Sequence, residues 1–130
     1  MKNKIFMAAR IILGLIFFVF GLNGFLNFIP APPTMPEGAM AFMTGMMAAP
    51  YFFPVLKGTE VICGALLLSG FAAPLALVIL APITLQIFFF HSFLTPGLEN
   101  VVMPVVMIAL HVTAAMGYWS LYKPLFSRHK

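Results

Sequence analysis

The chain has 130 residues, of which 62% are hydrophobic and 8% charged, whereas an ordinary soluble domain is roughly 45–50% apolar and about 25% charged. Seven Lys or Arg residues against three acidic ones give a net charge of +4. So little polar surface excludes a soluble enzyme domain, a nucleic-acid-binding module and a disordered tail, and it indicates a single membrane domain over residues 1–130.

The first predicted membrane span covers residues 5–29, because crossing the hydrocarbon core takes about 20 apolar residues. Lys2 and Lys4 before it would also suit a secretory signal peptide, but the stretch is longer than the apolar region of such peptides. Four prolines between Pro30 and Pro36 then end the helix. The apolar stretch 38–49 is too short to cross, so we expect a short interfacial helix there.

Three further spans are predicted at residues 55–71, 75–93 and 101–122. Turns containing glycine or proline separate them. We therefore expect an all-α, four-helix transmembrane bundle. An even number of spans puts both termini on one side, and both termini are basic, which predicts that both are cytoplasmic.

Polar residues of all four predicted helices fall in the outer half of the bilayer. Lys57 and Glu60 are three residues apart, so they share one helix face and can pair. Charged groups at membrane depth are costly and usually face the bundle interior. We predict one ligand-binding pocket, without a metal, that is formed by Asn23, Asn27, Lys57, Glu60, Gln86 and His91.

Simpler interpretations of the same residues stay open. A Lys57–Glu60 pair can serve only to fix helix register, and asparagines commonly hydrogen-bond between membrane helices. A histidine at a helix end can simply be interfacial. His111 lies at mid-bilayer without an assigned role; its ring could bond a neighbouring carbonyl.

Small and sulfur-containing residues complete the pattern. Gly14, Gly21 and Gly24 form a stripe that would let the first helix pack closely. The single cysteine, Cys63, excludes an internal disulfide or a cysteine-pair redox motif, and no motif for a covalently bound cofactor is present. The Met-rich segment Met35–Met47 is either a flexible lid or a helix resting on the membrane.

The ordered motifs of the chain resemble those of the DoxX family. They are the first helix from Arg10 to Phe25, the P-x-x-K-x-x-E-x-x-x-G-x-L-L-L-x-G segment that starts at Pro54, the Ala81-Pro82 step, and His91 with Phe93. The resemblance covers essentially the whole chain.

The resemblance implies a multi-pass protein of a bacterial-type inner membrane. Relatives include a subunit of a thiosulfate:quinone oxidoreductase, so a redox-associated subunit that holds a quinone or a similar lipophilic molecule is expected. The expected partners are the lipid bilayer and either a redox protein or further copies of the chain. A non-enzymatic transporter or membrane accessory protein is the alternative, and whether the chain is catalytic stays open.

Overall fold

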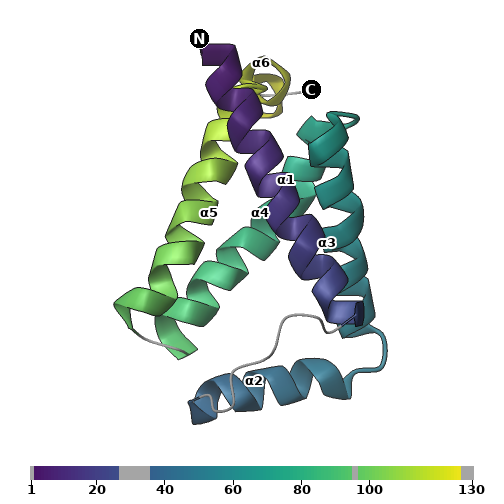
Figure 1. Cartoon of the computed structure of the whole chain (residues 1–130), viewed down its shortest axis with the longest axis vertical. Helices are drawn as coiled ribbons and strands as arrows, with labels where there is room; N and C mark the ends of the chain where they lie inside the picture. The colour runs from purple at the N-terminus through teal and green to yellow at the C-terminus, as the bar shows by residue number, and fades with distance from the viewer. Residues whose placement is uncertain (1, 27–35, 95–96, 127–130) are drawn as a thin grey trace.

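The structure is a computed structural model that describes residues 2–26, 36–94 and 97–126, and all its regular elements are helical (Figure 1). In chain order the elements are α1 (Lys2–Leu26), α2 (Glu37–Ala48), α3 (Phe52–Ser69), α4 (Ala73–Phe89), the π-helical turn η1 (Phe90–Leu94), α5 (Leu98–Met116), α6 (Trp119–Tyr122) and the 3₁₀ turn η2 (Lys123–Phe126). The all-α prediction is confirmed.

Three helices of the described chain are long and apolar enough to cross a membrane, namely Lys4–Leu26, Phe52–Ser69 and Ala73–Leu94. The region predicted as a fourth span is instead two helical segments, Val101–Met116 and Trp119–Phe126, that meet at a bend of 77°. The count is therefore three, or four when the bent pair is one span. Residues 27–29 of the predicted first span lie outside the described residues.

The helices converge at one end and spread apart at the other (Figure 1). The start of α1 and the α6 segment lie together at the convergent end, whereas α2 runs across the opposite end. We call these the terminal end and the α2 end. The cavity that forms the candidate site lies between the helices beneath α2.

Glycines hold α1 directly against α3. A methyl group added at Gly64 would lie 2.6 Å from the backbone nitrogen of Phe18 and 2.9 Å from the carbonyl oxygen of Gly14. Gly21 is equally close to α3, since an added Cβ would lie 2.8 Å from the nitrogen of Val61. Because lipid is as apolar as the helix surfaces, such backbone contact and van der Waals packing supply much of the association. The predicted close packing of the first helix is confirmed.

A buried histidine joins α5 to α4. The Nε2 atom of His111 lies 2.8 Å from the carbonyl oxygen of Leu77, and its Nδ1 atom lies 2.9 Å from the hydroxyl of Thr84. A carbonyl can only accept, so Nε2 carries the proton and the neutral ring accepts at Nδ1 from Thr84. Pro82 lies inside α4 between Leu77 and Thr84. Because proline has no N–H group, the carbonyl oxygen of Val78 lacks its usual helical hydrogen bond. His111 bonds the carbonyl one residue before Val78.

Most of the apolar surface faces outward. In each of the three candidate spans, only 22–28% of an 18-residue apolar stretch is buried inside the protein. Exposed side chains along the spans include Leu15, Ile62 and Leu75, each more than half exposed. An apolar surface that extends over several helices suits a lipid environment, whereas soluble proteins rarely expose apolar patches of this size to water.

The helix contact makes a prediction for two glycines of α3. Gly64→Ala should destabilise the protein in detergent by about 1–3 kcal/mol, because the new methyl group meets backbone atoms that cannot move independently. Gly58→Ala is the matched control, since a Cβ there meets nothing within 4 Å and alanine favours a helix by up to about 1 kcal/mol. Thermal unfolding of both variants checks this; equal melting temperatures would contradict a backbone contact at Gly64.

Candidate functional site

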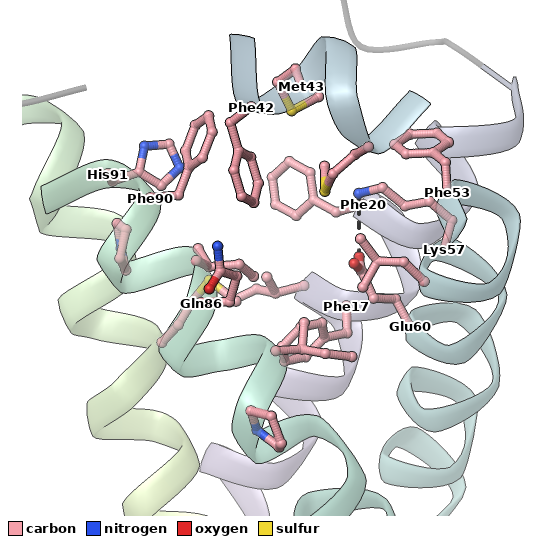
Figure 2. Close-up of a pocket in the computed structure, with 18 of the residues that line it drawn as sticks. Phe17, Phe20, Phe42, Met43, Phe53, Lys57, Glu60, Gln86, Phe90 and His91 are labelled. Atoms are coloured by element: carbon pink, nitrogen blue, oxygen red, sulfur yellow. Dashed lines mark hydrogen bonds and ion pairs between the residues drawn. The ribbon is translucent and has the colours of Figure 1, made fainter. Parts of the chain in front are cut away.

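A cavity of about 880 Å³ lies between the helices directly beneath α2. We call it the main cavity, and its lining residues come from α1, α2, α3, α4–η1 and α5 (Figure 2). They are Ile16, Phe17, Phe20, Phe42, Met43, Met46, Phe52, Phe53, Leu56, Lys57, Glu60, Pro82, Ile83, Gln86, Ile87, Phe90, His91, Met103, Pro104 and Met107. Its volume lies within the range of about 300–1,000 Å³ that is usual for small-molecule sites.

The wall formed by α3 carries the charges. Lys57 Nζ lies 3.5 Å from Glu60 Oε1, and their side chains are 21% and 4% exposed. The same ammonium lies 5.6 Å from the centre of the Phe53 ring, within cation–π range. The predicted pairing of Lys57 with Glu60 is therefore observed, and the pair faces the bundle interior and not lipid (Figure 2).

Glycines of α1 provide the space for this pair. The Lys57 methylene groups occupy the position that a Cβ on Gly24 would take. Gly21 faces Glu60 in the same way, because an added Cβ would lie 3.1 Å from the Glu60 Cβ. The close approach of the two helices thus fixes where the charged side chains lie.

The opposite wall, formed by α4 and η1, carries neutral polar groups. Figure 2 shows Gln86 and His91 across the cavity from Lys57 and Glu60. The π-helical turn that contains Phe90 and His91 follows α4 without a break and sets both rings against the cavity. The two rings pack edge to face with centroids 5.3 Å apart.

Side chains of α2 close the cavity over the α2 end. Phe42, Met43 and Met46 of α2 line the cavity, and Figure 2 shows Phe42 projecting from α2 toward it. Phe42 also contacts Phe90 of η1, with ring centroids 5.5 Å apart. Met43 and Met46 of the Met-rich segment therefore belong to the lining. That the segment acts as a lid stays a prediction.

The main cavity brings together four of the six predicted site residues, namely Lys57, Glu60, Gln86 and His91. Asn23 is half-buried and is not part of the lining. It shares a helix face with Phe20 but lies one turn closer to the end of α1. Asn27 lies outside the described residues. That any of these residues binds a ligand stays a prediction.

Several lining residues were missed from the sequence. Met103, Pro104 and Met107 of α5 line the cavity beside Gln86 and Ile87. The buried stripe of α5 that includes Pro104, Met107 and His111 was the available signal, because it marks the interior face of that helix. Of the three consecutive phenylalanines Phe88–Phe90, only the last lines the cavity.

The arrangement suits an amphiphilic ligand. Among the described residues, no group of three His, Cys, Asp or Glu side chains could hold a metal ion. The ammonium of Lys57 and the amide of Gln86 can donate hydrogen bonds to ligand oxygens, whereas Glu60 can accept one. The aromatic and methionine side chains of the lining can surround an apolar ring or chain.

The comparison with protein-family models finds one match. The DoxX family model matches residues 5–92, from the first turn of α1 into η1, and the match includes Lys57 and Glu60 of the cavity. Neither the curated proteins nor the solved structures include a match to the chain.

The paired charges make a prediction for stability. Glu60→Gln leaves the Lys57 ammonium without its carboxylate, and breaking a buried pair typically costs about 3–5 kcal/mol. The double variant Lys57→Met with Glu60→Leu should recover part of that loss, because it leaves no unpaired charge. Thermal unfolding in detergent measures both. Unchanged melting in Glu60→Gln and Lys57→Met alone would show that the pair contributes nothing to the folded state.

Proposed function

The chain belongs to the DoxX family of membrane proteins, and we propose that its main cavity binds a quinone or a similar lipophilic small molecule in a redox-associated membrane subunit. The observation that carries the proposal is the distribution of polarity within the cavity. One ion pair and two neutral polar side chains face each other across a space otherwise lined by aromatic, methionine and aliphatic groups (Figure 2). A quinone has the same distribution, with two carbonyl oxygens on a ring and an apolar tail.

Each polar group has a role in this proposal. Lys57 donates to one quinone carbonyl, and Gln86 or His91 donates to the oxygen on the opposite side of the ring. Glu60 holds Lys57 in position through the 3.5 Å contact. His91 and Glu60 are the lining groups able to exchange a proton, which quinone reduction requires. In this proposal, the electrons would come from a partner redox protein.

The proposal also covers the membrane arrangement. The start of α1 and the α6 segment lie together at the terminal end (Figure 1), and the basic residues Lys4 and Lys123 belong to these parts of the chain, which supports cytoplasmic termini in an inner membrane. At 12 residues, α2 is about 18 Å long and too short to span, so we propose that it lies in the outer interface.

Terminal tags accessible to protease only from the cytoplasmic side would agree with this topology; tags cleaved from the outside would contradict it.

Ligand binding is tested with matched pairs of adjacent residues. Phe90 lines the main cavity, whereas Phe89 is 45% exposed and does not line it. Phe90→Ala should weaken binding of a short-chain quinone roughly tenfold or more, because a buried aromatic contact contributes about 1.5–3 kcal/mol. Phe89→Ala should bind like the wild type. Met46→Ala and Met47→Ala form the same kind of pair, since Met46 lines the cavity and Met47 is 61% exposed.

Calorimetric titration in detergent gives these affinities, and mass spectrometry of molecules that copurify shows what the cavity holds in cells. Equal losses in the Phe89 and Phe90 variants would contradict binding in the main cavity. Equal affinity for quinone, quinol and a redox-inert analogue of the same shape would instead favour the alternative of a transporter or accessory protein.

A further inference from the structure

A second, smaller cavity of about 150 Å³ lies at the terminal end, remote from the site described above. Phe6, Met7 and Arg10 of α1 line it together with Gly117 and Tyr118, where the chain bends between α5 and α6. We call it the terminal cavity. Its volume is several times the roughly 30 Å³ that one water molecule takes in the liquid, so a phosphate group fits within it.

Arg10 supplies the charge of the terminal cavity. Its Nη1 donates a long hydrogen bond of 3.4 Å to the hydroxyl of Tyr118. The same nitrogen lies against Gly70, where an added Cβ would be 2.6 Å away. Its Nε is buried and has no hydrogen-bond partner in the described part of the chain. The guanidinium is thus held in place at its Nη1 corner, while its donors are only partly used.

In the described part of the chain, no acidic side chain forms an ion pair with Arg10. The chain has three glutamates, of which Glu60 pairs with Lys57. Glu37 begins α2 and Glu99 belongs to the first turn of α5, both at the α2 end of the bundle. Among the described residues, the ion pair of Lys57 with Glu60 is the only one. A half-buried cation that has no counter-charge among the described residues favours an anion from outside the protein.

The depth of the terminal cavity matches the headgroup region. Trp119, which is 52% exposed, begins the segment that bends away by 77°, and Tyr118 directly precedes it. Aromatic residues of this kind gather at the boundary between membrane and water. Leu125 and Phe126 at the end of the bent segment are exposed as well, as expected of a segment that rests on lipid.

From these contacts we propose that the terminal cavity binds the phosphate group of an anionic phospholipid. The guanidinium of Arg10 donates to the phosphate oxygens, a pairing that its planar fork of N–H groups favours. The Tyr118 hydroxyl accepts from Arg10 and therefore keeps its own hydrogen to donate to the same phosphate.

The test compares lipids and soluble phosphates on the purified full-length chain. Native mass spectrometry counts the molecules of phosphatidylglycerol and phosphatidylcholine that remain bound as detergent is exchanged, and thermal unfolding is measured with each lipid added. The wild type should retain phosphatidylglycerol preferentially and melt at a higher temperature with it than with phosphatidylcholine. Inorganic phosphate and glycerol 3-phosphate at millimolar concentration should not displace the lipid, because they lack acyl chains.

Variants separate a defined site from general positive charge. Arg10→Gln should weaken phosphatidylglycerol binding about tenfold or more, and Tyr118→Phe should weaken it by a smaller factor, since charge-assisted hydrogen bonds are the stronger ones. Arg10→Lys should lie between Arg10→Gln and the wild type, because it keeps the charge without the fork. Lys4→Gln removes the same charge at an exposed position and should have almost no effect.

Equal losses in Arg10→Gln and Lys4→Gln would overturn the site in favour of diffuse attraction. Displacement of the lipid by inorganic phosphate would overturn it in favour of a soluble anion. If Arg10→Gln fails to fold, the wild-type comparison of the two lipids and the Tyr118→Phe variant decide the question. Equal retention of both lipids by the wild type contradicts the proposal. None of these outcomes bears on the main cavity.

Discussion

The backbone contact between α1 and α3 is the constraint on which the rest of the structure depends. Gly14 of α1 and Gly64 of α3 face each other, and a Cβ added at either one would lie within 3.0 Å of the carbonyl oxygen of the other. With the helices this close, Gly24 and Gly21 face Lys57 and Glu60, and the charged side chains lie along the seam and into the bundle. A bulkier residue at Gly24 would displace the Lys57 ammonium, and one at Gly21 would displace the Glu60 carboxylate. An isolated charge in lipid costs several kcal/mol.

A second, independent contact holds α4 to α5 through His111, Thr84 and Leu77. The two helix pairs are therefore each joined by specific contacts, one by glycine packing and the other by buried hydrogen bonds. The pairs spread apart toward the α2 end (Figure 1), and the main cavity occupies the space that results. Each pair supplies one polar wall, so the geometry of the cavity follows from how far the pairs separate.

Helical periodicity and residue chemistry were enough to predict the helices, the glycine packing and the pairing of Lys57 with Glu60. Spacing also indicated the interior face of α5, where Pro104, Met107 and His111 are buried. The bend after Met116 and the π-helical turn at Phe90 could not be predicted, because neither changes hydropathy and both depend on tertiary contacts. Asn23 is polar and shares a helix face with Phe20, yet the cavity lining on α1 ends at Phe20, a limit that depends on tertiary packing and not on local sequence.

The two kinds of wall have a consequence for selectivity. Lys57 and Glu60 are fixed by backbone contact, so the part of the cavity beside them can discriminate strictly between polar groups. Met43 and Met46 on α2 have flexible, unbranched thioether side chains that adapt to different shapes. In the function proposed above, the ligand would be recognised stringently by its polar groups beside Lys57 and Glu60 and loosely by its apolar part beside the methionines, so homologues that differ only in chain length would be accepted as equivalents.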